Sequence, residues 1–403
     1  MTAPNAHPVV ARTGHGAAAP AATSPGAPRT TSDVRDMVLA AIDRHTPLRI
    51  VGRGTWLAGG RPVTSAEPIH LGALTGIVDY TPGDLTLTAR AGTPLSEIAA
   101  ATAAERQWLA LVPWGGDDGT LGATLATATA GPVAGMFGTP RDVAIGIETV
   151  TGTGDIVRGG GRVVKNVAGF DLTRLMVGAW GTLGVITEVS VRLRALPECD
   201  ETVALPLNGE SSLGTLLAKV RTAPIGPLSL ELISAAAARR IALGEGSTLL
   251  VRIAGNAELV AAQRAALAAV GDVVDAPPNV WTALRTVEPT EAAVVRLSGT
   301  VARFAETWSA AERLAAAAGG LAHASVQRSV VRVVMPLQDG ALSEAGVAAL
   351  RGESRDTRIF ERLPASMWTS VAPTAVADRL SRGVRTAFDP HRLLNPGILG
   401  EPA

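Results

Sequence analysis

The segment GRGTWL contains residue types that could hold a phosphate anion. Glycine lets successive backbone N–H groups converge on an anion because no Cβ stands in the way. An arginine in the segment adds positive charge, and a threonine adds a hydroxyl donor, which together suit a pyrophosphate. A plain strand-to-strand turn is the simpler interpretation of this segment taken alone, because glycine turns are common. The residues are Gly52, Arg53, Gly54, Thr55, Trp56 and Leu57.

A second glycine-containing segment, TLGATLATATAGP, follows at residues 120–132. Gly122 would allow the backbone to lie flat against a ring or a phosphate, and Thr120 and Thr124 offer hydroxyl groups. Close packing between helices explains the same glycine equally well. The pair Arg141–Asp142, expected at the start of the next strand, is more typical of an ion pair than of a ligand contact.

The third segment, KNVAGFDLTRLMVGAWGTLGVIT, covers residues 165–187. Its final GTLGVIT predicts a sharp turn before a strand, whose first peptide groups could donate to and accept from the edge of a flat heterocycle. Lys165 and Asn166 could supply a cation and an amide to the same ligand, although a surface lysine is the simpler alternative.

Two common nucleotide-binding motifs are excluded. The pattern G-x-G-x-x-G requires a glycine where Leu57 stands, and the LAGGRPV that follows cannot begin a helix. No G-x-x-x-x-G-K-[ST] string occurs in the chain. A nucleotide bound by these segments therefore requires a different scaffold.

Local patterns place the segments on a frame of helices and strands. A helix is expected at residues 32–45 with Ser32 as its N-cap, and PLRIVG is expected to form a short buried strand. A second helix is expected to begin at Thr93–Pro94, and a third is expected to be capped by Asp171. Residues 143–160 predict a hairpin, and residues 203–358 alternate apolar strands with alanine-rich helices, which predicts a second α+β domain.

Composition narrows the class of protein. A chain of 403 residues predicts two or three domains. The 36 basic and 36 acidic residues give no electrostatic support for binding nucleic acid or a membrane surface.

Cys199 is the only cysteine, so we expect no intrachain disulfide, and we interpret it as a buried thiol. No metal site and no membrane span are predicted. The first 30 residues lack the pattern of a secretion signal, which favours a disordered tail and a cytoplasmic protein.

Taken in chain order, the segments resemble the FAD-binding domain of the vanillyl-alcohol oxidase or PCMH type, and in particular the FAD-binding subunit of bacterial glycolate oxidase. The string KNVAGFDLTRLMVG is the most specific match, followed by TLG, GTLGVIT and the FDPHRLLNPG near the C-terminus. The resemblance covers roughly residues 35–197 and about the last 40.

The resemblance implies an α+β protein: two α/β subdomains that hold FAD, and an α+β cap domain with an antiparallel sheet. The expected boundaries are a disordered tail at 1–31, an FAD-binding domain at 32–197, a cap domain at 198–360 and a C-terminal segment at 361–403 that returns to the FAD domain. The implied FAD-binding residues are Gly52, Arg53, Gly54, Thr55, Trp56, Leu57, Thr120, Leu121, Gly122, Thr124, Asp142, Lys165, Asn166, Gly184, Val185, Ile186 and Thr187.

The chain departs from the family pattern at several positions. Ala123 and Phe170 replace a common glycine and a common tyrosine. The first two segments lack the histidine or cysteine that relatives use to attach FAD covalently, so noncovalent FAD is expected. The paired histidines of related 2-hydroxyacid dehydrogenase subunits are also missing, and His323 is interpreted as structural. Catalytic residues stay unassigned.

The leading functional hypothesis is an FAD-binding subunit of a glycolate oxidase complex that takes part in electron transfer. The implied partners are a catalytic flavoprotein subunit and an iron–sulfur subunit, and the implied substrate class is small 2-hydroxy acids. One alternative is a stand-alone FAD-dependent dehydrogenase in which Arg328 and Arg332 bind a substrate carboxylate. The other alternative is a scaffold that has lost its flavin.

Overall fold

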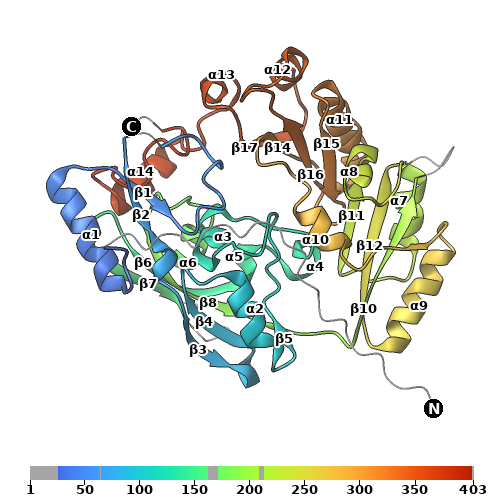
Figure 1. The fold of residues 1–403 in the computed structure, drawn as a ribbon, viewed down its shortest axis with the longest axis horizontal. Coiled ribbons are helices and arrows are strands. Elements are labelled where there is room, and N and C mark those ends of the chain that lie inside the picture. The colour runs from blue at the N-terminus through green and yellow to red at the C-terminus, as the bar shows by residue number, and fades with distance from the viewer. Residues whose placement is uncertain (1–25, 64, 162–170, 208–212, 402–403) are drawn as a thin grey trace.

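Two antiparallel sheets organise the chain in the computed structural model, which describes residues 26–63, 65–161, 171–207 and 213–401. A five-stranded sheet has the order β3-β4-β8-β6-β7, and an eight-stranded sheet has the order β13-β10-β12-β11-β15-β16-β14-β17. Figure 1 shows them side by side, the first at the left and the second at the right. The described residues include no helix long and apolar enough to cross a membrane.

The part of the chain before residue 198 forms the smaller sheet, its helices and two further two-stranded sheets, β1-β2 and β5-β9. Its elements are α1 (Thr31–Arg44), β1 (Leu48–Val51), β2 (Glu67–His70), β3 (Ile77–Thr81), β4 (Thr86–Arg90), α2 (Leu95–Ala103), β5 (Gln107–Trp108), α3 (Leu121–Thr127), α4 (Ala134–Phe137), α5 (Pro140–Val143), β6 (Ala144–Val150), β7 (Ile156–Gly160), α6 (Leu172–Met176), β8 (Val185–Arg192) and β9 (Arg194–Ala195).

The remainder of the chain forms the larger sheet and the C-terminal segment. Its elements are β10 (Cys199–Pro206), α7 (Leu213–Thr222), β11 (Ser229–Ile233), α8 (Ala235–Arg240), β12 (Thr248–Gly255), α9 (Ala257–Ala268), β13 (Val274–Asp275), α10 (Val280–Arg285), β14 (Ala292–Ser298), α11 (Phe304–Ala317), β15 (Leu321–Ser325), β16 (Val330–Pro336), α12 (Glu344–Arg351), β17 (Thr357–Arg362), α13 (Trp368–Val371) and α14 (Arg379–Phe388).

Each sheet is stabilised by an apolar face. In the smaller sheet, Val189 and Val191 of β8 pack with Ile98 of α2 and with Leu121 and Leu125 of α3. In the larger sheet, one face packs against α7, α9, α11 and α12 around the fully buried side chain of Phe304. Burial of these apolar side chains is the main favourable contribution to folding.

The C-terminal segment returns to the first strand. Leu48 N donates to Leu393 O at 2.7 Å, and Asn395 N donates to Leu48 O at 2.8 Å. The side chain of Asn395 accepts from Ile50 N at 2.9 Å and donates to Trp180 O at 2.7 Å. Asn395 therefore joins β1 to the turn that precedes β8. Figure 1 shows the red C-terminal segment beside blue β1.

Most of the expected elements form, including the hairpin of β6 and β7 and the helix α6 capped by Asp171. Ser32 is not the N-cap of α1, because Thr30 and Asp33 form a capping box there and Thr31, expected in the tail, is already helical. Helix α2 begins at Leu95, one residue later than expected, with Pro94 as its N-cap.

Two further expectations are wrong. Arg141 and Asp142 lie in the short helix α5, not at the start of a strand. Cys199 begins β10 and is only partly buried, because it lies near the edge of the larger sheet, on the strand that pairs with the short edge strand β13.

Replacement of Asn395 tests the connection between the chain ends. We expect Asn395→Ala to lower the free energy of unfolding by roughly 2–4 kcal/mol, because Ile50 N and Trp180 O each lose a hydrogen-bond partner. The backbone of Asn395 also has φ 44°, a left-handed conformation that asparagine tolerates better than alanine. Urea unfolding measures the difference. The control is Asn279→Ala, because Asn279 is exposed and its side chain makes no cap bond; equal losses in the two variants would contradict the assignment.

Candidate functional site: a cleft between the glycine-containing segments

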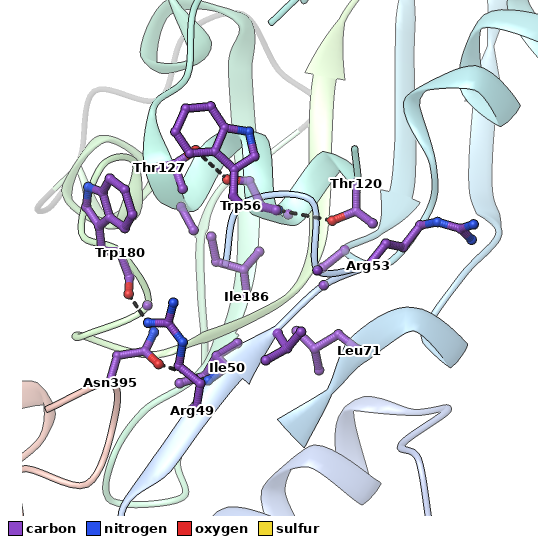
Figure 2. A pocket seen from close by; sticks show the side chains of 18 of the residues that line it. Arg49, Ile50, Arg53, Trp56, Leu71, Thr120, Thr127, Trp180, Ile186 and Asn395 are labelled. Carbon is purple, nitrogen blue, oxygen red and sulfur yellow. Dashed lines mark hydrogen bonds between the residues drawn. The ribbon is translucent and has the colours of Figure 1, made fainter. Parts of the chain in front are cut away.

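The glycine-containing segments meet in a cleft (Figure 2). One wall is the loop after β1, the second is the start of α3, and the third is the turn that leads into β8. Asn395 and Ile398 close the cleft from the C-terminal segment.

Ten of the residues implied by sequence line this cleft. They are Gly52, Arg53, Gly54, Thr55, Trp56, Leu57, Thr120, Gly122, Gly184 and Ile186. The first loop and the other two segments are thus brought together in space, as a shared ligand requires. The assignment of these residues to a cofactor is our proposal.

The other implied residues lie elsewhere. Leu121 and Val185 are buried in apolar clusters. Thr124 Oγ1 donates to Thr120 O, and Thr187 Oγ1 donates to the Glu148 carboxylate. In β8 the side chains alternate between faces, so Ile186 can face the cleft only if its two neighbours face away.

Asp142 also lies outside the cleft. Its carboxylate accepts from Thr139 N at 2.8 Å in the capping box of α5, and this hydrogen bond is the main cause of its lowered pKa. Lys165 and Asn166, like Phe170, lie outside the described residues.

The loop after β1 presents unpaired backbone donors. Among the described residues, the N–H groups of Arg53, Gly54, Thr55 and Trp56 donate to no acceptor, whereas Leu57 N reaches Gly54 O at 3.4 Å. Gly54 has φ 80°, a conformation that glycine adopts without strain. Successive free amides of this kind form a concave site for an anion.

Gly52 and Gly122 bring the cleft walls into close contact. A Cβ on Gly52 would lie 2.8 Å from Thr120 Oγ1, and a Cβ on Gly122 would lie 2.6 Å from Ala91 Cβ. The packing explanation for Gly122 is therefore correct, and the same glycine also lines the cleft. A side chain at Gly52 would push the start of α3 away from the loop, and one at Gly122 would push α3 away from Ala91 at the end of β4.

Arg49 is a cleft residue that the sequence analysis missed. It lies on β1, and its Nη1 is buried without a hydrogen-bond partner among the described residues. Burial lowers the pKa of Arg49, since the charged form loses hydration. A buried guanidinium N–H that faces a cleft is suited to an anionic or carbonyl ligand. The sequence feature that could have pointed to Arg49 is that it is an arginine within the otherwise apolar strand PLRIVG.

Trp180 was also missed. Its ring meets Trp56 edge to face, with centroids 6.5 Å apart and planes at 75°, and both rings line the cleft. Trp180 has φ 54°, a conformation that is uncommon for a bulky residue. Hydrogen bonds from Trp180 N to Ala126 O and from Asn395 Nδ2 to Trp180 O hold this backbone in place. Figure 2 shows both indoles on the same side of the cleft.

The charge of the cleft suits an anion. The described lining residues include two arginines but no carboxylate and no histidine. Arg53 is exposed, and in Figure 2 its side chain extends away from the two tryptophans. Arg49 is therefore the better placed of the two cations for a ligand held between the walls.

Comparison with known proteins identifies this type of site. Residues 26–160 match the family model described as an FAD binding domain. This match covers about a third of the chain and includes the first two walls of the cleft. In structure it is similar to p-cresol methylhydroxylase and to 4-ethylphenol oxidase from Gulosibacter chungangensis, each with a TM-score of 0.70 over 93% of this chain and 88% of the other. Identities of 14% and 15% make this a likeness of fold.

Closer sequence similarity is found with subunits of glycolate oxidase. The chain is 38% identical over 232 residues to glycolate oxidase subunit GlcE of Escherichia coli, which covers 57% of this chain and 65% of that protein. It is 30% identical over 208 residues to glycolate oxidase subunit GlcD of Bacillus subtilis, which covers 51% and 44%. The chain thus aligns with less than two thirds of the length of either relative.

The residues present fit FAD. The free amides of residues 53–56 suit the diphosphate, and the indoles of Trp56 and Trp180, which line the same cleft as Gly184 and Ile186, suit a flat heterocycle. FAD has both features.

Substitution of Gly54 tests the loop. We expect Gly54→Glu to abolish retention of FAD, because a carboxylate there repels the phosphates and strains a backbone with φ 80°. Absorbance near the visible flavin band measures the FAD content of purified protein. Gly54→Asn controls for the backbone, and Gly83→Glu, on an exposed turn with open space around it, controls for the charge. FAD retention by Gly54→Glu would refute the assignment.

Replacement of Arg49 tests the buried cation. We expect Arg49→Met to weaken FAD binding by about tenfold to a hundredfold, as loss of a charge-assisted hydrogen bond would. Arg53→Met should weaken it by less than about fivefold, because an exposed cation is screened by solvent. Titration of apoprotein with FAD, followed by flavin fluorescence, gives both dissociation constants. The reverse order of the two variants would contradict the role of Arg49.

Proposed function

We propose that this protein is the FAD-carrying subunit of a complex that oxidises a small 2-hydroxy acid such as glycolate. The observation that carries the proposal is the cleft with unpaired amides between residues 53 and 56. The similarity to glycolate oxidase subunits from two bacteria supports the substrate class. When bound, FAD supplies the electron-accepting chemistry, while the protein supplies binding and orientation.

The attachment of FAD is proposed to be noncovalent. Covalent attachment requires a side-chain nucleophile such as histidine or cysteine close to the ring, and neither residue type is among the described residues that line the cleft. Backbone amides and Arg49 hold the diphosphate in this proposal, and Trp56 and Trp180 exclude water from one side of the cleft.

His323 is not placed to abstract a proton from a substrate. It is fully buried, its ring lies 4.3 Å from that of Trp114, and its Nε2 lies 3.2 Å from the Glu288 carboxylate. Burial lowers the pKa of His323. These contacts support a structural role. The proposed complex accordingly includes a catalytic flavoprotein subunit and an iron–sulfur subunit, with this chain relaying electrons.

A stand-alone dehydrogenase would need a free cation for the substrate carboxylate. Arg332 does not meet this need, since it is saturated by Glu288 and Glu361. Arg328 has no such ion pair among the described residues.

A visible spectrum of the purified protein tests the cofactor. We expect a flavin spectrum in the native protein and a yellow supernatant after acid precipitation, because noncovalent FAD is released when the fold is lost. Colour that stays in the pellet would contradict noncovalent attachment, and colourless protein that takes up no added FAD would contradict the function as a whole.

Anaerobic addition of glycolate tests the division of labour. We expect the flavin of the isolated chain to stay oxidised and to bleach only after a catalytic flavoprotein subunit is added. Rapid bleaching without a partner would instead establish a stand-alone dehydrogenase.

A further inference from the structure

We propose that Glu231 and Arg328, with the hydroxyls of Ser229 and Ser325, form a binding site for a small carboxylate on the larger sheet. The inference rests on the proposed function and deepens it, because it assigns the carboxylate of an acid ligand to named residues.

The residues are brought together by strand register. Glu231 of β11 stands directly opposite Ser325 of β15, and Ser229 lies two residues before Glu231, so the three side chains share one face of the sheet. This face is opposite the one packed against α7, α9, α11 and α12, to which Leu230 and Leu232 belong. Arg328 lies in the turn between β15 and β16.

The cluster lacks hydrogen-bond partners. Glu231 and Ser229 are fully buried and Ser325 is 6% exposed, yet the carboxyl oxygens of Glu231 and both serine hydroxyls have no hydrogen-bond partner outside this cluster among the described residues. Buried polar groups are nearly always paired, so an unpaired cluster requires an explanation. A ligand that accepts and donates hydrogen bonds would satisfy it.

A second polar cluster on the same face provides the contrast. There the Glu288 carboxylate accepts from Arg332, Arg362 and His323, and Arg332 also pairs with Glu361. Burial alone would raise the pKa of Glu288, but Arg332 and His323 lower it, so Glu288 is ionised and matched. The Glu231 cluster has no comparable set of protein partners.

The charges around Glu231 favour an anion. Burial raises the pKa of Glu231 to about 8, although the charge of Arg328, the neighbouring hydroxyl of Ser325 and the charge of Arg332 act in the opposite direction. At pH 7 its carboxyl is therefore neutral and can donate its O–H. Arg328 is half-buried, and no hydrogen bond or ion pair to it is formed by the described residues. A neutral hydrogen-bond donor such as protonated Glu231, next to the positive charge of Arg328, can bind the carboxylate of a ligand.

The pKa of Arg328 depends in part on the charge of Asp142, which lies in the first part of the chain. Burial and the nearby charge of Arg296 lower the pKa of Arg328, whereas Glu231 and Asp142 raise it. The carboxylate of Asp142 is engaged by Thr139 in α5, which leaves it as a long-range partner only. The site therefore retains positive character that a small acid can neutralise.

The site lies next to the flavin-binding part. Helix α4 contacts β11, and a Cβ on Gly135 of α4 would lie 2.7 Å from Gln327 Cδ. Helix α4 follows α3, whose Thr127 lines the cleft. Gln327 and Arg328 are partly exposed, so the Arg328 side of the cluster is the side nearest to solvent.

Calorimetric titration of the full FAD-loaded chain tests the site. We expect glycolate and acetate to bind and the uncharged analogue glycolamide not to bind, because the carboxylate is the recognised group. Arg328→Met should weaken glycolate binding by about tenfold to a hundredfold. Arg239→Met on the exposed end of α8 should leave it unchanged. Arg328→Lys, which keeps the charge, should recover part of the affinity.

The pH dependence tests Glu231. We expect the affinity of the native protein for glycolate to fall as pH rises through about 8, because ionised Glu231 repels the ligand carboxylate. Glu231→Gln keeps a neutral donor and acceptor, so it should bind glycolate at pH 7 and lose most of this decline. A steep decline that persists in Glu231→Gln would refute its role.

Other outcomes overturn the site itself. Equal binding of glycolamide, or unchanged binding by Arg328→Met, would show that no carboxylate is recognised there. Flavin absorbance of each sample separates the two proposals: protein without flavin contradicts the proposed function, whereas flavin-loaded protein that binds neither acid contradicts only the carboxylate site.

Discussion

The unpaired amides of residues 53–56 must be held in fixed positions by the structure around them. Backbone donors left without acceptors are costly unless water or a ligand pairs with them. Their positions must therefore be fixed before any ligand arrives. Gly52 against Thr120, Gly122 against Ala91, and Asn395 between β1 and the turn at Trp180 fix them. Preorganised donors bind an anion without the cost of ordering a mobile loop.

The two sheets use their faces differently. The smaller sheet buries one face beneath α2 and α3 and thereby places α3 at the cleft. The larger sheet buries an apolar face beneath four helices, while part of its other face carries ionisable residues from β11, β15 and β16. Matched charges at Glu288 and Arg332 join this face into a rigid network. The groups around Glu231 have no such matched ion pair among the described residues.

The glycine segments were predictable because they act through the backbone. The sequence shows which residues lack a Cβ. Side chains in β8 alternate between the two faces, so Ile186 lines the cleft and its two neighbours do not. Arg49, Trp180 and Asn395 were not predictable in the same way, since their roles depend on side-chain direction and on pairing across distant segments. The misplaced Ser32 and Asp142 share another cause: a threonine followed three residues later by aspartate marks a capping box in both places.

The link from Asn395 to Ile50 spans 345 residues. During synthesis, the ribosome releases the loop after β1 long before it releases the residue that locks the strand in position. The cleft beside β1 therefore reaches its final form only after the chain has been synthesised past Asn395. A ligand that needs the complete cleft can bind only after this later segment has docked against β1.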